Sequence, residues 1–136
     1  MEKIEVYIDG ASKGNPGESA YGIVILKDKK IYIKKGDFIG ITTNNIAEYI
    51  SLIFALIECL PLKNQEIEIK SDSLLLVNQI NGKYKVKDAQ LKILHFIAIS
   101  LISRYNKIKI IHIDREENKT ADKIANLFIE KKKNLF

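Results

Sequence analysis

The first regular pattern in the chain is Lys3-Ile4-Glu5-Val6-Tyr7-Ile8-Asp9. Apolar and polar residues alternate along it, which predicts a β-strand buried on one face. The strand is expected to end at Asp9, before Gly10, with the aspartate on the side opposite the apolar residues. A second stretch, Glu66-Ile67-Glu68-Ile69-Lys70-Ser71-Asp72, repeats the alternation and also ends on an acid. The chain is predicted to become helical directly after Asp72.

In the rest of the chain, strand patterns come first and are followed by alternating helix and strand patterns. Strands are expected at 3–9, 19–27, 31–40, 66–71 and 107–113, and helices at 44–60, 73–80, 88–105 and 119–131. A strand meander followed by alternating helices and strands predicts an α/β fold in which helices flank a mixed sheet. With 136 residues and 46% hydrophobic content, residues 1–136 form one domain that can bury a core without disulfides.

Two further acids lie near the starts of predicted helices. Glu48 falls within about the first turn of helix 44–60, behind polar capping residues. Asp122 flanks the apolar stripe of the last helix, one turn beyond Asn118. In open α/β sheets, strand ends and helix starts can converge at one edge, where ligands bind. We therefore expect Asp9, Glu48, Asp72 and Asp122 to meet there.

Four clustered carboxylates predict a site for divalent metal. Like charges a few ångströms apart drive protonation unless a cation lies between them. Hard oxygen ligands favour Mg²⁺ or Mn²⁺, and the lone Cys59 cannot build a thiolate zinc site. Cys59 lies among apolar helix residues and is predicted to be part of the core. Any single acid could be an ordinary exposed residue at a strand end, but that explanation is much weaker for all four.

Four blocks in the chain resemble the signature blocks of the type 1 ribonuclease H family, in the family's order. They are Tyr7-Ile8-Asp9-Gly10-Ala11-Ser12-Lys13-Gly14-Asn15-Pro16-Gly17, Thr43-Asn44-Asn45-Ile46-Ala47-Glu48, Ser71-Asp72-Ser73 and Arg115-Glu116-Glu117-Asn118-Lys119-Thr120-Ala121-Asp122. The resemblance implies the ribonuclease H-like fold with a five-stranded mixed sheet. It also implies an endoribonuclease that cuts the RNA strand of RNA/DNA hybrids and leaves 5′-phosphate and 3′-hydroxyl ends.

The resemblance further implies roles for individual residues. The positions matching Asp9, Glu48 and Asp72 hold one Mg²⁺ or Mn²⁺ ion, and those matching Asp9 and Asp122 hold a second. Two such ions can activate a water and stabilise the leaving oxygen of an in-line phosphoryl displacement. A protein nucleophile is then unnecessary.

Four polar residues match family positions that contact substrate. Asn15, Asn44 and Asn45 correspond to residues that reach the minor groove, where 2′-hydroxyls distinguish RNA from DNA. Thr43 corresponds to a residue that binds a phosphate of the DNA strand. Short polar groups at a loop and a helix start can equally be turn and capping residues, and both roles can coexist.

The chain departs from the family before the last acid. His112 stands ten residues before Asp122, at the spacing of the family's catalytic histidine, but it alternates with apolar residues and can belong to the last strand. Arg115 lies in the following loop and is slightly favoured for a phosphate or product-release role, because guanidinium stays charged at any pH. A surface ion pair is the competing interpretation of Arg115.

Two more departures suggest a short form of the family. Residues 81–88 replace a longer basic protrusion, although Lys83, Lys85 and Lys87 around Tyr84 could follow a phosphate backbone. A solvated loop explains this segment equally well. The first strand begins at residue 3, so no N-terminal hybrid-binding domain is expected.

Two other patterns are set aside. Gly10-Ala11-Ser12-Lys13-Gly14 fits the G-x-S-x-G elbow of hydrolases, but the elbow must turn directly into a helix, and Asn15-Pro16-Gly17 continues the loop instead. Ser12 is therefore not expected to be a nucleophile. His95 shares a helix side with apolar residues and is interpreted as a partly buried structural histidine.

The net charge of +5 and the pI near 9.2 are compatible with a polyanionic partner. No signal peptide or membrane-spanning stretch is recognised, so a cytoplasmic protein without membrane association is expected, with a monomer as the default. RNA/DNA hybrid is the favoured substrate, and double-stranded RNA is a further candidate because A-form duplexes are recognised by shape. Two alternatives stay open: a binding module on the same fold without turnover, and a DNA-cutting transposase or resolvase-like core.

Overall fold

The computed structural model describes the backbone of residues 3–135 and the side chains of residues 3–132. A five-stranded sheet has the order β3-β2-β1-β4-β5. Its strands are β1 (Lys3–Gly14), β2 (Gly17–Lys27), β3 (Lys30–Thr42), β4 (Glu66–Ser71) and β5 (Lys107–His112). The helices are α1 (Asn44–Glu58), α2 (Leu74–Ile80), α3 (Ala89–Ile102) and α4 (Lys119–Leu135), with short 3₁₀ turns η1 (Leu60–Leu62) and η2 (Arg115–Asn118).

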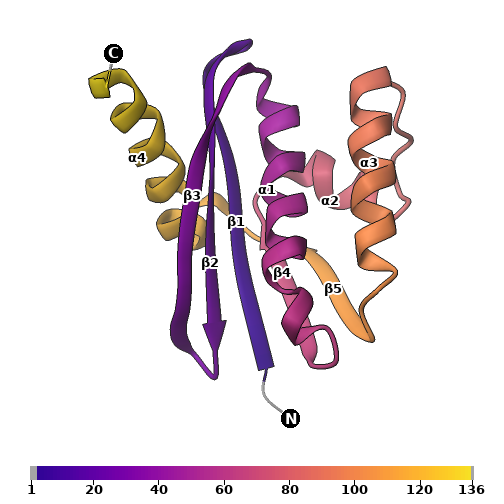
Figure 1. Ribbon diagram of the computed structural model, residues 1–136. Helices are drawn as coiled ribbons and strands as arrows, with labels where there is room; N and C mark the ends of the chain where they lie inside the picture. The colour runs from indigo at the N-terminus through magenta and orange to yellow at the C-terminus, as the bar shows by residue number, and fades with distance from the viewer. Residues whose placement is uncertain (1–2, 136) are drawn as a thin grey trace.

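The sheet is mixed, and helices cover both of its faces. Strands β1, β2 and β3 form an antiparallel meander, whereas β4 runs parallel to both β1 and β5. Helices α1, α2 and α3 lie on one face, and α4 lies on the other, against the meander (Figure 1). The predicted α/β architecture with a five-stranded mixed sheet is confirmed.

Two glycines let helices approach the sheet closely from opposite faces. A Cβ on Gly10 would lie 2.2 Å from the carbonyl carbon of Ala47, so α1 packs directly on the β1 backbone. A Cβ on Gly22 would lie 2.3 Å from the carbonyl oxygen of Ala121, so α4 packs just as closely on β2. Contacts this short are available only to a residue without a side chain. The starts of both helices are thereby held against the centre of the sheet.

The first strand is longer than its pattern predicted. It was expected to end at Asp9, but β1 continues to Gly14, because its antiparallel pairing with β2 runs through to Gly14 opposite Gly17. The parallel pairing with β4 does stop here, since its last register pair is Ile8 with Ser71. Asp9 therefore lies in the middle of β1, at the point where the neighbouring strand β4 ends.

The helices agree with the predicted ranges to within a few residues, with α1 ending at Glu58 and α4 extending to Leu135.

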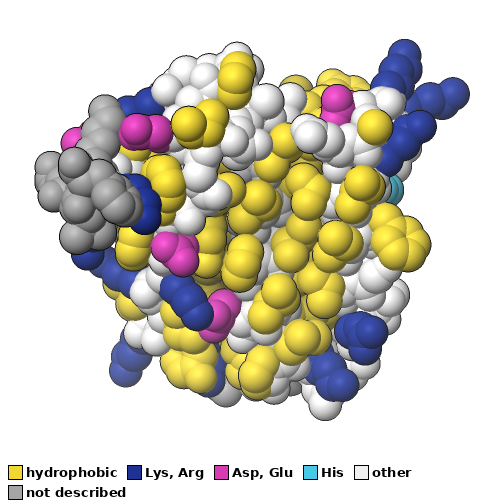
Figure 2. Space-filling model, turned by 45° about the horizontal axis from the view of Figure 1, so that its top comes forward, with side chains coloured by type: hydrophobic (Ala, Val, Ile, Leu, Met, Phe, Trp, Pro, Cys, Tyr) yellow, Lys and Arg dark blue, Asp and Glu magenta, His cyan; other side chains and the backbone are white. Residues whose placement is uncertain are grey.

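Apolar side chains gather on the surface shown in Figure 2, and the exposed large apolar residues include Phe54 and Ile57 of α1 and Ile93 and Phe96 of α3. Among residues 3–135, none of the helices is long and apolar enough to cross a membrane.

Candidate metal and catalytic centre

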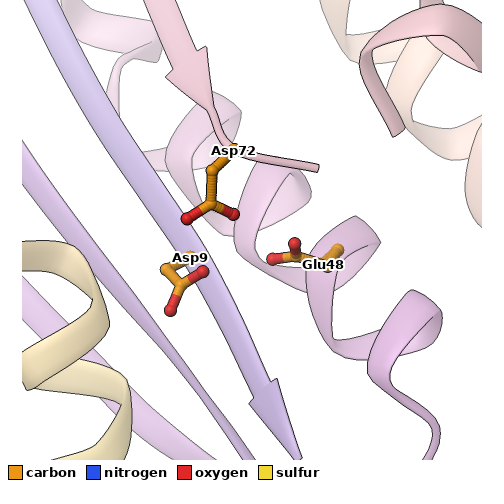
Figure 3. A group of neighbouring side chains, drawn as sticks. All are labelled: Asp9, Glu48 and Asp72. Carbon is orange, nitrogen blue, oxygen red and sulfur yellow. The ribbon is translucent and has the colours of Figure 1, made fainter. Parts of the chain in front are cut away.

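Three of the four acids converge where the parallel strands end. Asp9 comes from the middle of β1, Asp72 directly follows β4, and Glu48 lies in the second turn of α1. One carboxylate oxygen from each residue lies within 4.8 Å of the others, and Figure 3 shows the three side chains pointing toward one another. Asp9 and Glu48 are buried, whereas Asp72 is half-buried. The predicted meeting of strand-end and helix-start acids therefore holds for these three.

The fourth acid joins them from the opposite face of the sheet. Asp122, in the first turn of α4, lies close enough to Asp9 to contribute to the raised pKa of the Asp9 carboxyl group. All four acids line one hollow of about 290 Å³, whose walls are mostly polar. Its other lining residues are Gly10, Ala11, Ser12, Asn44, Arg115 and Asn126. The hollow is open to solvent, and the buried carboxylates of Asp9 and Glu48 form part of its wall.

Glu48 is fixed by the same glycine that admits α1. The backbone N–H of Gly10 donates a hydrogen bond to Glu48 Oε1. This bond is available because no side chain at Gly10 separates β1 from the helix. The carboxylate is thus held beside Asp9 by backbone geometry, which leaves little freedom for rotation.

The electrostatics of the acids call for a cation. Burial, followed by the charges of Glu48, Asp72 and Asp122, raises the pKa of Asp9 to about 9. Burial also raises the pKa of Glu48 to about 8, although the Gly10 N–H and the nearby Arg115 favour the ionised form. A divalent cation would offset this repulsion, and an all-oxygen donor set suits Mg²⁺ or Mn²⁺. The four residues therefore fit the predicted metal.

Arg115 and His112 occupy different positions relative to the hollow. Arg115, the first residue of η2, lines it, and its charge acts on Glu48. His112 is the last residue of β5; it is exposed and is not among the residues that line the hollow. The geometry favours Arg115 over His112 for contact with substrate, and the role of each residue stays a prediction.

The four residues expected to bind substrate gather around the start of α1, three from the helix end itself and one from the β1–β2 turn. Thr43 caps the helix, because its side chain accepts a hydrogen bond from the Ile46 N–H at 3.3 Å. Asn15 Oδ1 accepts from the Asn44 N–H at 3.0 Å, which ties the β1–β2 turn to the same helix end. Asn45 is exposed beside them. Capping roles are therefore present, and exposed polar groups remain next to the hollow.

The two motifs that were set aside have structural roles. Ser12 lies within β1, and its hydroxyl donates to the carbonyl oxygens of Gly14 and Thr42, so no strand-to-helix elbow exists there. His95 is half-buried, and its Nε2 lies 3.2 Å from the carbonyl oxygen of Gln79, as expected for a structural histidine. Cys59 is fully buried in the core, as predicted.

Two asparagines beside the acids were not predicted. Asn126 Nδ2 donates to Asp122 Oδ1 at 3.1 Å, an i to i+4 contact that helical spacing could have indicated. Asn118 Nδ2 donates to the carbonyl oxygen of Ile8 at 2.8 Å and to Asp72 Oδ2 at 3.4 Å. Nothing in the local sequence signals these last two contacts, because they join segments far apart in the chain.

Comparison with known proteins decides the family. A family model described as "Reverse transcriptase-like" matches residues 7–128. Ribonuclease H of Clostridium botulinum is 33% identical over 151 aligned positions, which cover 93% of this chain and 95% of that protein. The chain belongs to the ribonuclease H family. The resemblance carried by the four sequence blocks is thereby confirmed.

Other relatives of this ribonuclease H-family chain are longer than it is. Ribonuclease HI of Halobacterium salinarum is 38% identical over 125 residues, which cover 91% of this chain and 63% of that protein. A bifunctional protein of Mycobacterium tuberculosis is 36% identical over 126 residues, which cover 91% of this chain and 35% of that protein. The chain thus spans less than two thirds of the length of these two relatives.

Solved structures confirm the ribonuclease H fold of the chain. The crystal structure of RNase H1 from Halobacterium salinarum superimposes with a TM-score of 0.90 at 36% identity, covering 95% of this chain and 98% of that one. LC11-RNase H1, solved in complex with an RNA/DNA hybrid, gives a TM-score of 0.87 at 38% identity, covering 94% of this chain and 97% of that one.

Proposed function

We propose that the chain is a metal-dependent endoribonuclease that hydrolyses the RNA strand of RNA/DNA hybrids. The observation that carries the proposal is the set of three carboxylates within 4.8 Å of one another, with Asp122 beside Asp9 in the same hollow. Membership of the ribonuclease H family and the likeness to a relative solved with an RNA/DNA hybrid support it.

The proposed chemistry is an in-line displacement at phosphorus. The oxygen of a water molecule bonds to phosphorus and the bond from phosphorus to the 3′ oxygen breaks. One proton of the water ends on the 3′ oxygen, so the products carry a 5′-phosphate and a 3′-hydroxyl. Asp9, Glu48 and Asp72 would hold one Mg²⁺ or Mn²⁺ ion, and Asp9 and Asp122 a second. When bound, the two ions supply charge stabilisation for the attacking and leaving oxygens.

The protein's own residues would bind and orient the substrate. Four ionised carboxylates repel a phosphodiester. The sugar-phosphate backbone of the substrate can therefore enter the hollow only when bound cations balance the charge of the acids. Arg115 at the wall of the hollow offers a guanidinium for a phosphate oxygen. Asn44 and Asn45 begin α1, and Asn15 lies in the β1–β2 turn bonded to that helix end. These three residues would meet the 2′-hydroxyls of the RNA strand, and Thr43 would meet a phosphate of the DNA strand.

Three further properties are part of the proposal: the protein acts as a monomer, is located in the cytoplasm, and also acts on double-stranded RNA. Recognition of A-form shape supports activity on double-stranded RNA.

Cleavage of an end-labelled RNA strand annealed to DNA tests the proposal. We expect cutting in Mg²⁺ or Mn²⁺, no cutting in excess EDTA, and loss of cutting in Asp72→Asn. Asp37→Asn is a matched control, since Asp37 is exposed on β3 and does not line the hollow. Binding without cutting would support a recognition module, and faster cutting of an all-DNA duplex would support a transposase-like or resolvase-like core.

A further inference from the structure

The side chain of Asn118 links three segments that carry the acids. Asn118 ends η2 directly before α4, and it is 1% exposed. Its Nδ2 donates to the Ile8 carbonyl oxygen of β1 and to Oδ2 of Asp72, which follows β4. We infer that Asn118 is a positioning residue that holds the Asp72 carboxylate in place for metal binding. The inference rests on the proposed function.

The contact occurs where the sheet no longer fixes the acids relative to each other. Parallel pairing of β1 with β4 stops at Ile8 and Ser71, one residue before Asp9 and Asp72. Beyond that point the two strands no longer share register pairs. The Asn118 amide group spans this position and bonds to both segments.

The orientation of the amide follows from its two partners. A backbone carbonyl and a carboxylate are both acceptors, so only the NH₂ group of Asn118 can face them. The Asn118 Oδ1 atom is buried and, among the described residues, has no hydrogen-bond partner. An unpaired buried acceptor costs free energy. Packing alone would favour an apolar side chain of this size here, so the two donated bonds are what the amide contributes.

Among the three clustered acids, Asp72 is the one that most needs such a restraint. Asp9 and Glu48 are 5% and 4% exposed and are held within the protein, whereas Asp72 is half-buried. Solvent therefore competes for the Asp72 carboxylate and favours its rotation away from the other two acids. The donor from Asn118 opposes this rotation, so the three oxygens stay close together before a cation arrives. Loss of such an outer hydrogen bond typically weakens metal binding about 10–100-fold.

The test compares two substitutions that each replace a buried amide with an apolar side chain. Asn118→Leu removes both donated bonds, and Gln79→Leu is the control. Gln79 is 5% exposed and forms two hydrogen bonds, with Tyr49 and with the Lys85 carbonyl oxygen, and it does not line the hollow. Calorimetric titration of each protein with Mn²⁺, without nucleic acid, measures the affinity, and thermal unfolding measures the stability.

We expect both variants to lose stability, but only Asn118→Leu to bind Mn²⁺ about tenfold or more weakly. An unchanged Mn²⁺ affinity in Asn118→Leu would overturn the inference and leave the proposed function intact. If the wild-type protein itself binds neither Mn²⁺ nor Mg²⁺, the proposed function fails and the inference fails with it.

A measurement on the wild-type protein covers the case in which Asn118→Leu does not fold. In a nitrogen-15 NMR spectrum, the side-chain NH₂ of Asn118 should exchange slowly with water and shift when Mg²⁺ is added, because its acceptor Asp72 would become a metal ligand. Side-chain signals of Asn106, which bonds to Asn64 at an exposed position, serve as the reference. An Asn118 signal that does not move at saturating Mg²⁺ would contradict the positioning role.

Discussion

At the scale of single residues, the buried acids set how stability depends on pH. The pKa of Asp9 is raised to about 9 and that of Glu48 to about 8, whereas both groups titrate at about 4 in an unfolded chain. Between these values the folded state binds more protons than the unfolded state, so stability falls as pH rises. Their stabilising contribution is complete below about pH 4 and is lost as pH rises through about 8 to 9.

Asp9→Asn should therefore stabilise the metal-free protein at alkaline pH. In EDTA, we expect the Tm of the variant to be closest to that of the wild type near pH 4 and to exceed it by pH 9, at about 4 °C for each kcal/mol of desolvation and repulsion removed. Thermal unfolding from pH 4 to 9 measures the difference. Saturating Mg²⁺ should raise the Tm of the wild type only. A difference that does not grow with pH would show that Asp9 is ionised throughout.

Replacing Arg115 and His112 separately distinguishes their proposed roles. Arg115→Ala should lower kcat about tenfold, which corresponds to about 1.4 kcal/mol of transition-state stabilisation, because it removes the cation at the wall of the hollow. His112→Ala should leave kcat within about twofold, and Arg115→Lys should recover part of the loss. Steady-state cleavage of a hybrid at saturating Mg²⁺ gives these values. The assignment is wrong if neither alanine variant is slowed, and His112 takes the role if its variant alone is slow.

At the scale of elements, close packing of α1 and α4 on the sheet places two of the acids. Gly10→Ala and Gly22→Ala each put a methyl group within 2.4 Å of helix backbone, at Ala47 and Ala121 respectively. Each helix must move away, at a cost of about 1–3 kcal/mol or more. We expect both variants to show lower Tm and weaker Mn²⁺ binding, since α1 carries Glu48 and α4 carries Asp122.

Gly82→Ala separates steric displacement from backbone strain. Gly82 has φ +78°, and a Cβ there would meet nothing within 4 Å, so only the left-handed conformation should cost about 1–2 kcal/mol. Its Mn²⁺ affinity should match that of the wild type. A Gly10→Ala variant that unfolds and binds Mn²⁺ like Gly82→Ala would refute the close-packing argument.

The elements also show how far the sequence predicts the site. Periodicity predicted the five strands and four α-helices that the structure describes, and the acids at strand ends and helix starts include the three that lie within 4.8 Å of one another. The end of β1 was misplaced, because Gly10 disrupts the local pattern while pairing with β2, which local patterns do not report, continues the strand to Gly14. Asn118 was overlooked for the same reason, since its partners Ile8 and Asp72 are remote in sequence.

At the scale of the whole molecule, the net charge of +5 predicts salt-sensitive recognition of a nucleic acid. Each phosphate neutralised by a lysine or arginine releases counterions, so affinity falls as salt rises. We expect kcat/KM for a hybrid to fall steeply between about 50 and 200 mM salt, with kcat nearly constant. Initial rates at limiting and saturating hybrid separate the two quantities.

Replacing Lys83 and Lys85 with Gln tests whether this part of the surface causes the salt dependence of kcat/KM. Both residues are exposed in the segment between α2 and α3, away from the lining of the hollow. The salt dependence of kcat/KM should become shallower if this segment follows the phosphate backbone. Rates of the wild type that ignore ionic strength would count against electrostatic binding altogether.

The division of the four acids between the two sides of the sheet has a practical consequence. Glu48 lies on α1 at one face of the sheet, and Asp122 lies on α4 at the other. Asp9 lies in β1, and Asp72 directly follows β4. A folding intermediate in which α1 or α4 has not yet packed on the sheet lacks Glu48 or Asp122 at the site. Nuclease activity recovered after refolding would therefore report only molecules in which both helices are packed. Turnover would then be a stricter measure of the yield of native protein than helix content.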